Sequence, residues 1–123
     1  MKALIVAYYF PPKGGAGTQR FAKFCKYLPT HGITPVVVTV TADSRSEYAP
    51  HDDASLGIGG ATEVVRVATP SRAPLLLRLA RKARLHVDDD EWAWAASEVA
   101  VATARQHHCE VVVTTLSPYA NWR

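Results

Sequence analysis

Four short apolar runs, spread through the chain, place the strongest limit on how it can fold. They are residues 3–7 (ALIVA), 33–41 (ITPVVVTVT), 63–68 (EVVRVA) and 110–115 (EVVVTT). None of them alternates strictly between apolar and polar residues, as a strand with one solvated face does. Continuous apolar runs of this length are typical of strands buried on both faces, and such strands occur in parallel sheets covered by helices.

Helical patterns separate these runs. The first helix is expected to begin at Thr18 as its cap and to end at Pro29 and Gly32. Its apolar positions recur every three or four residues and predict one buried face: Phe21, Phe24, Cys25 and Leu28. Residues 43–62 are polar and glycine-rich and predict a long loop.

Two further helices are expected, over residues 74–87 and 92–107. The acidic run 88–91 precedes the second of them and suits its positive N-terminal end. Strands that alternate with helices predict a parallel, Rossmann-like α/β sheet of about four strands with helices on both faces. In the common strand order 3-2-1-4, the first and fourth strands are neighbours.

The end of the chain resembles the start of another helix, with Ser117 as cap and Pro118 at the first position. A doubly wound domain normally continues with more strands after its fourth. We therefore expect residues 1–123 to form a single, incomplete domain.

Composition narrows the classes of function. The 48% of apolar and 20% of charged residues argue against disorder, and a net charge of +3 alone supports neither nucleic-acid nor membrane binding. Cys25 and Cys109 match no metal spacing and are expected to be reduced, buried thiols. No metal site is expected, because the consecutive aspartates 88–90 cannot all point at one ion. The apolar N-terminal run is too short for a signal peptide, and we expect a cytoplasmic protein.

A basic cluster offers a candidate membrane surface in and before the helix 74–87. Its members are Arg72, Arg78, Arg81, Lys82 and Arg84. With a leucine-rich apolar face beside them, they could rest peripherally on the anionic cytoplasmic face of a membrane. The alternative is an ordinary solvated helix face over a core stripe.

The stretch YYFPPKGGAGTQR, residues 8–20, joins the first strand to the first helix. Glycines there let the backbone approach a ligand, and free N–H groups at the helix start attract anions. The candidate residues for contact with a ligand are Gly14, Gly15, Gly17, Thr18 and Arg20. The alternatives are a tight turn for the glycines, a cap for Thr18 and a solvated side chain for Arg20.

Known phosphate-loop patterns fit this stretch incompletely. Gly15 and Gly17 match the first two glycines of G-x-G-x-x-G, but Arg20 stands where a small residue is required, and only Asp43 could mimic the ribose-binding acid. The P-loop pattern is absent from the sequence, and a flavodoxin-like loop would carry more hydroxyls than Thr18 alone. A nucleotide-binding, oxidoreductase-like module remains an alternative, although no bound cofactor is expected.

The opening resembles the start of family 4-type, GT-B-fold glycosyltransferases, in the branch that begins with tyrosines, two prolines and a glycine cluster before a helical arginine. The matching residues are Tyr8, Tyr9, Pro11, Pro12, Gly14, Gly15, Gly17 and Arg20. The likeness continues through residues 21–40. It returns at DDDEWAWAA around Trp92 and at VVVTTLSPYA near the end.

This resemblance implies the acceptor-side domain of an enzyme that moves a sugar from a nucleotide-sugar co-substrate to a glycan or lipid-linked acceptor, as in polysaccharide biosynthesis. The glycine loop would approach the donor's diphosphate, and Ser117 and Tyr119 would line the acceptor cleft. The donor-binding domain is expected to be missing from these residues and to come from elsewhere, for example a separate chain. The alternative is a non-catalytic, truncated fragment. No catalytic residue is assigned, and the only loop candidates are Asp43 and His51.

Overall fold

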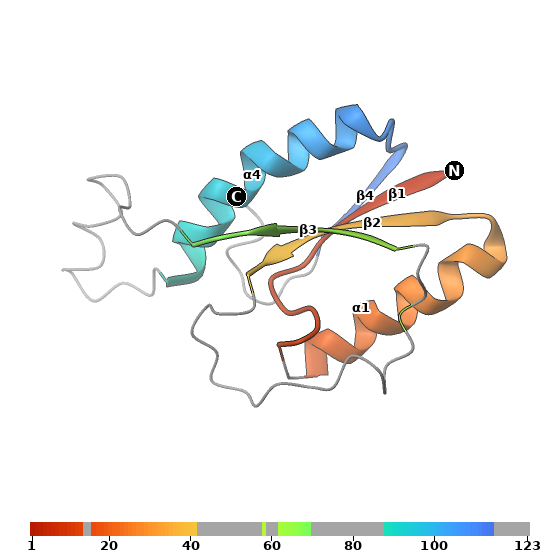
Figure 1. The fold of residues 1–123 in the computed structure, drawn as a ribbon, viewed down its shortest axis with the longest axis horizontal. Coiled ribbons are helices and arrows are strands. Elements are labelled where there is room, and N and C mark those ends of the chain that lie inside the picture. The colour runs from red at the N-terminus through yellow and green to blue at the C-terminus, as the bar shows by residue number, and fades with distance from the viewer. Residues whose placement is uncertain (14–15, 42–57, 59–61, 70–87, 115–123) are drawn as a thin grey trace.

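The computed structural model describes residues 1–13, 16–41, 58, 62–69 and 88–114 (Figure 1). These residues form an α/β fold of four strands, two α-helices and one 3-10 helix. In chain order the elements are β1 (Lys2–Val6), α1 (Ala16–Tyr27), η1 (Leu28–His31), β2 (Thr34–Val40), β3 (Glu63–Val67), α4 (Asp88–Gln106) and β4 (Val111–Thr114).

The four strands form one parallel sheet in the order β3-β2-β1-β4, which confirms the expected order. β1 is central, and its last residue, Val6, pairs with Val38 of β2 and with Thr114 of β4. β2 and β3 lie on one side of β1, and the chain then crosses through α4 to place β4 on the other side. The strand order therefore reverses between β1 and β4, which is where α/β sheets bind ligands.

Helices α1 and α4 lie on opposite faces of the sheet (Figure 1), which confirms the expectation of helices on both faces. The buried cluster under α4 contains Leu4, Tyr8, Val36, Val38, Val40, Val67, Trp92 and Ala96. The buried cluster under α1 contains Ile5, Ala7, Phe10, Phe21, Cys25 and Val37. Successive residues of β1 and β2 alternate between these clusters, which explains why both strands are apolar throughout.

The prediction that the fourth strand is buried is wrong. All four residues of β4 are exposed, and Val112 is 57% exposed. The physical reason is the position of β4 at the edge of the sheet, where β1 is its one neighbour among the described strands. β3, at the other edge, is half-buried, and of its residues only Val67 is fully covered.

The first helix begins at Ala16, two residues before the expected start. Its end agrees with the sequence: η1 contains Pro29 and is closed by Gly32, which adopts a left-handed φ of 72° and donates its N–H to the Pro29 carbonyl. A left-handed φ of this kind favours glycine.

The buried face of α1 is only partly the expected one. Phe21 and Cys25 are buried, but Phe24 is 45% exposed, so its assignment to the core is wrong. Thr18 and Ala22 occupy the covered face instead. The apolar spacing permits either placement, and the smaller residues allow α1 to lie close to the sheet.

The second long helix, α4, begins at Asp88, four residues earlier than expected. The acidic run therefore forms its first turn rather than preceding it, which still places negative charge at the positive end of the helix. The expected loop 43–62 lies largely outside the described residues, and the expected helix 74–87 lies wholly outside them. Within the described part of the chain, no helix is both long and apolar enough to cross a bilayer.

Candidate functional site

Residues 8–13 follow β1 at its carboxyl end, beside the end of β4. The pairing of Val6 with Thr114 places the two strand ends next to each other at the point where the strand order reverses. Ligands of open α/β sheets bind in the crevice at this point. Of the residues predicted for this crevice, Gly14, Gly15, Ser117 and Tyr119 lie outside the described residues.

Side chains from three elements hold residues 8–13 in place. Each donates a hydrogen bond to a backbone carbonyl, which satisfies acceptors that no strand ladder reaches. These bonds run from Thr39 Oγ1 of β2 to the Tyr8 carbonyl at 3.3 Å, from Arg66 Nη2 of β3 to the Pro11 carbonyl at 2.8 Å, and from Thr18 Oγ1 of α1 to the Lys13 carbonyl at 2.7 Å.

An aromatic cluster supports the same segment from the α4 side. The rings of Tyr8 and Tyr9 meet edge to face with centroids 5.1 Å apart, and those of Tyr8 and Trp92 do so at 5.2 Å. Such pairs stabilise beyond their buried area by about 0.5–1.5 kcal/mol. Trp92 is fully buried, and none of the described residues accepts a hydrogen bond from its indole Nε1. The tyrosines and Trp92 that carry the sequence resemblance are thus in contact through Tyr8.

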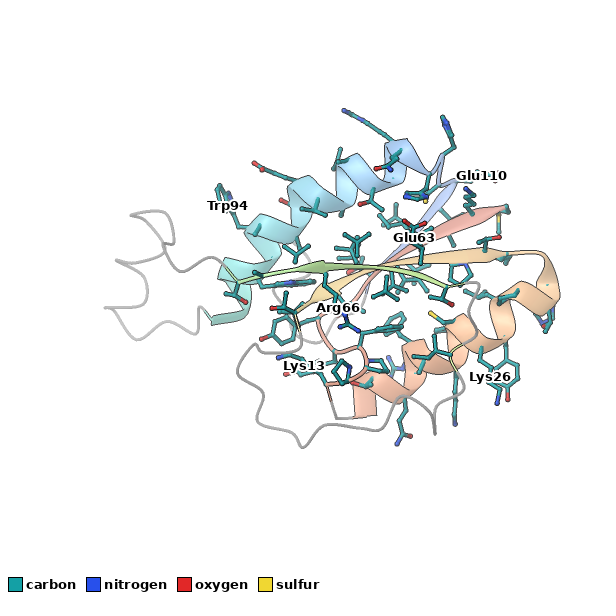
Figure 2. The ribbon with its side chains drawn as sticks, viewed as in Figure 1. Lys13, Lys26, Glu63, Arg66, Trp94 and Glu110 are labelled. Atoms are coloured by element: carbon teal, nitrogen blue, oxygen red, sulfur yellow. The ribbon has the colours of Figure 1, made fainter. Side chains whose placement is uncertain are left out.

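Lys13 is buried next to this cluster, with only 3% of its surface exposed. Its Nζ lies 4.6 Å from the centre of the Tyr8 ring, a distance at which a cation is attracted to the face of an aromatic ring. Figure 2 shows Lys13 and Arg66 on the same side of the sheet, below β3 in that view. The segment that precedes α1 therefore carries one cationic side chain, Lys13, and is contacted by a second, Arg66 of β3.

Gly17 is the second residue of α1 and is half-buried. Its φ is not in the left-handed region, and a Cβ placed on it would make only ordinary contacts, the nearest being Tyr9 Cβ at 3.6 Å. Neither backbone strain nor crowding by the described residues therefore requires glycine here. The tight-turn alternative does not account for Gly17.

The prediction that Thr18 caps α1 is wrong. Thr18 is the third residue of the helix and is fully buried, with its hydroxyl donating back to the Lys13 carbonyl. Arg20 is the fifth residue of α1 rather than a first-turn residue, and it is exposed. Arg20 is therefore accessible to a ligand, whereas Thr18 supports residues 8–13 from the protein interior through its hydrogen bond to Lys13.

Sequence reasoning missed three residues that shape this site: Lys13, Thr39 and Arg66. Arg66 had a signal, since it interrupts the apolar run of β3. Thr39 and Lys13 gave none, because a threonine in a strand and a lysine among prolines and glycines are both ordinary surface residues. Thr39 takes part in the site because of the register of β2, and Lys13 because of the path of residues 8–13.

The two cysteines are free, as expected. Burial raises the pKa of the Cys25 thiol to about 12, an effect that the Thr62 side chain opposes to a smaller extent. Cys109 is half-buried rather than buried, and desolvation also raises its pKa. No group of three potential metal ligands occurs among the described residues.

Several predicted residues cannot be placed in this site. Asp43, His51 and the basic cluster lie outside the described residues; that cluster comprises Arg72, Arg78, Arg81, Lys82 and Arg84. His107, just after α4, pairs with Glu63 at the start of β3, with 3.4 Å between Nε2 and Oε1. This contact joins α4 to the sheet at the end opposite the site.

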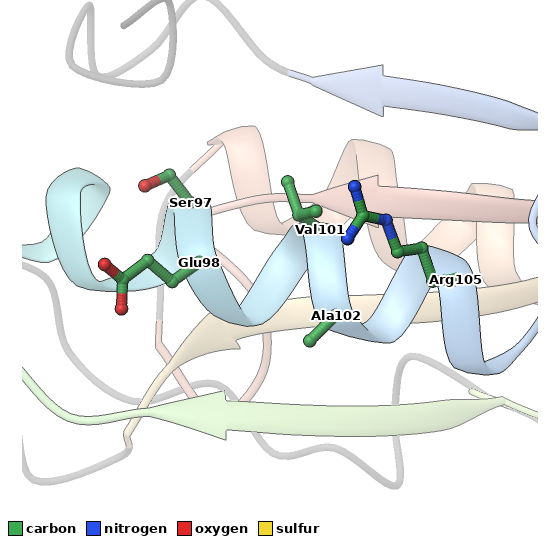
Figure 3. Close-up of a pocket in the computed structure, with 5 residues that line it drawn as sticks. All are labelled: Ser97, Glu98, Val101, Ala102 and Arg105. Carbon is green, nitrogen blue, oxygen red and sulfur yellow. The ribbon is translucent and has the colours of Figure 1, made fainter.

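A surface hollow lies on the outer side of α4 (Figure 3). Its lining residues are Ser97, Glu98, Val101, Ala102 and Arg105, all of them exposed. None of them belongs to residues 8–13 or to a strand end. The hollow is a shallow groove between side chains of one helix and is not part of the candidate site.

No protein-family model, curated protein or solved structure matches this chain. What the structure defines is therefore the class: an α/β protein with a four-stranded parallel sheet, compatible with a Rossmann-like arrangement.

Proposed function

We propose that this chain forms the acceptor-side domain of a GT-B-type glycosyltransferase and that its glycine loop approaches the diphosphate of a nucleotide sugar. The observation that carries the proposal is the position of residues 8–13 beside the end of β4, where the strand order reverses. The sequence resemblance to such enzymes is concentrated in this segment. Sheet topology and sequence likeness therefore point to the same loop.

The chemistry of the segment favours an anionic ligand. Helix α1 begins directly after Gly14 and Gly15 in the sequence and has no acidic residue in its first turn, so its N-terminal N–H groups and positive dipole end are not neutralised within the helix. Arg20 adds an exposed cation on the same helix, and neither backbone strain nor crowding by the described residues requires glycine at position 17. A diphosphate matches this combination of close backbone approach and positive charge.

In this proposal the domain contributes binding and orientation, and the acceptor lies in the cleft near Ser117 and Tyr119. A second Rossmann-like domain would hold the nucleotide and the rest of the donor. Fixing two reactants in one cleft accelerates transfer by removing the entropy cost of bringing them together. No described residue is assigned as catalytic base. The basic cluster at Arg72–Arg84 would bring the domain to a membrane that carries a lipid-linked acceptor.

An NMR titration of the ¹⁵N-labelled chain tests the proposal. UDP-glucose, GDP-mannose and inorganic pyrophosphate serve as probes, with NADH for comparison. We expect the amide resonances of Lys13, Gly17 and Arg20 to shift with dissociation constants around 1 mM, as befits one wall of a cleft. The Arg105 amide on the outer face of α4 serves as the internal control and should not move.

Two results would contradict the proposal. The first is the absence of shifts near α1 with every phosphate-bearing probe. The second is tighter binding of NADH than of the nucleotide sugars, which would favour the oxidoreductase-like alternative. That alternative needs a small residue at position 20 for close packing of helix against strand, whereas Arg20 is exposed on α1. Replacement of Arg20 by Ala should weaken pyrophosphate binding, whereas Arg105→Ala should not.

A further inference from the structure

The guanidinium of Arg66 connects three parts of the fold at the carboxyl edge of the sheet. Its Nη2 donates to the Pro11 carbonyl at 2.8 Å, and its Nη1 lies 3.5 Å from the Val40 carbonyl at the end of β2. Arg66 belongs to β3, which is separated from β1 by β2. The side chain therefore reaches across one strand to hold the segment that follows another (Figure 2).

Strand register explains why this reach is possible. Arg66 pairs with Thr39 of β2, so the two side chains project from the same face of the sheet. Both donate to the segment after β1, Thr39 to the Tyr8 carbonyl and Arg66 to the Pro11 carbonyl. Two neighbouring strands thus fix the segment at two points, three residues apart.

The hydrogen bonds of this segment leave few free acceptors. Four of its carbonyl oxygens accept hydrogen bonds from within the chain: those of Tyr8, Phe10, Pro11 and Lys13. A carbonyl oxygen that faces a phosphate repels it, whereas one turned into the protein does not. Because these four carbonyl oxygens are engaged within the chain, the groups left to meet an anion are backbone N–H donors and cationic side chains.

The charge of Arg66 is not neutralised by these bonds. Both of its acceptors are uncharged carbonyls, and within the described part of the chain no carboxylate forms an ion pair with it. An arginine keeps its charge at all physiological pH values, and its planar donors suit two acceptors at once. The positive charge consequently remains beside the segment that leads into the glycines.

We infer that Arg66 is a positioning residue for residues 8–13, holding the Pro11 carbonyl away from a bound diphosphate while adding positive charge beside it. The inference rests on the proposed function for the identity of the ligand, but not for the positioning itself. Arg66 contacts neither reacting atoms nor substrate in this arrangement, and it acts through the backbone at Pro11.

The test compares Arg66→Met, which removes donors and charge, with Arg66→Lys, which keeps the charge but has a single donor nitrogen. Arg105→Met on α4 is the matched control. The first readout is amide hydrogen exchange without ligand at Lys13, whose N–H donates to the Phe10 carbonyl at 3.0 Å, with Val37 of β2 as a reference for global opening. In Arg66→Met we expect about tenfold faster exchange confined to this loop amide, in line with the loss of a charge-assisted hydrogen bond.

The second readout is the affinity for inorganic pyrophosphate. We expect Arg66→Met to weaken it about tenfold and Arg66→Lys to restore most of the loss, with no change in Arg105→Met. Unchanged loop exchange in Arg66→Met overturns the inference, as does faster exchange that extends equally to Val37, since that would show general destabilisation. If the loop exchange responds as expected but the wild-type chain does not bind pyrophosphate, positioning is supported and the proposed function is contradicted.

Discussion

Replacement of Thr18 by valine isolates the hydrogen bond that ties α1 to the segment after β1. The substitution keeps the branched shape but removes the hydroxyl that donates to the Lys13 carbonyl at 2.7 Å. Thr18 is fully buried and Lys13 is almost so, hence water cannot replace the lost donor. An unsatisfied buried carbonyl costs about 1–3 kcal/mol. Valine and threonine have similar helix propensities, and so the change in unfolding free energy reports on this bond.

Thr18→Ser is the matched control, because it keeps the hydroxyl and removes one buried methyl group, at a cost of about 0.8 kcal/mol. Urea unfolding followed by tryptophan fluorescence measures both variants. A loss of about 2 kcal/mol should lower the midpoint for Thr18→Val by about 1 M, given slopes of about 1–3 kcal/mol/M. Thr18→Ser should lie between it and the wild type. A valine variant as stable as the wild type, or more stable than the serine variant, would refute the reasoning.

Three further outcomes are expected. Burial raises the pKa of Cys25 to about 12, so the stability that the buried neutral thiol contributes is complete below pH 9 and is lost as the pH rises toward 12. The difference in urea midpoint between the wild type and Cys25→Ala should therefore narrow at high pH, and a constant difference would contradict this. Because β4 is an exposed apolar edge strand, we expect the wild-type chain to associate with rising concentration in sedimentation velocity, and Val112→Lys to reduce that association. The unfolding free energy should change by no more than about 0.5 kcal/mol, and association that is absent in the wild type or unaltered in the variant would exclude β4 as the contact. Trp92→Ala should lower the unfolding free energy, followed by circular dichroism, by about 3–5 kcal/mol. Trp92→Phe should cost less than half of that, since the indole N–H has no hydrogen-bond partner among the described residues, and equal losses would contradict this.

The strands and their order could be predicted because each depends on a local pattern. Apolar runs without alternation indicate strands covered on both faces, and alternation with helices makes the sheet parallel. The exposure of β4 could not be predicted, because the run of Val111, Val112 and Val113 has the same appearance in a central strand as at an edge. Whether a strand is central or lies at the edge of the sheet is decided by strand pairing, and the local sequence does not specify it.

The candidate site was predictable in place but not in detail. The glycines and their position after the first strand located it, whereas the burial of Lys13 and the reach of Arg66 depend on contacts between residues far apart in sequence. Thr18 illustrates the limit, since a threonine before a helical pattern suggests a cap. The helix instead begins at Ala16, and Thr18 faces inward.

The central position of β1 also has a consequence for the order of assembly on the ribosome. β1, α1 and β2 are contiguous in sequence and can pair as soon as they emerge, since the N-terminal part of a chain becomes available first during synthesis. The other edge of β1 stays unpaired until α4 and β4 have been made, and contacts of such long sequence separation form slowly. The candidate site at the ends of β1 and β4 therefore cannot form before β4 has been made, whereas β1 and β2 can pair earlier.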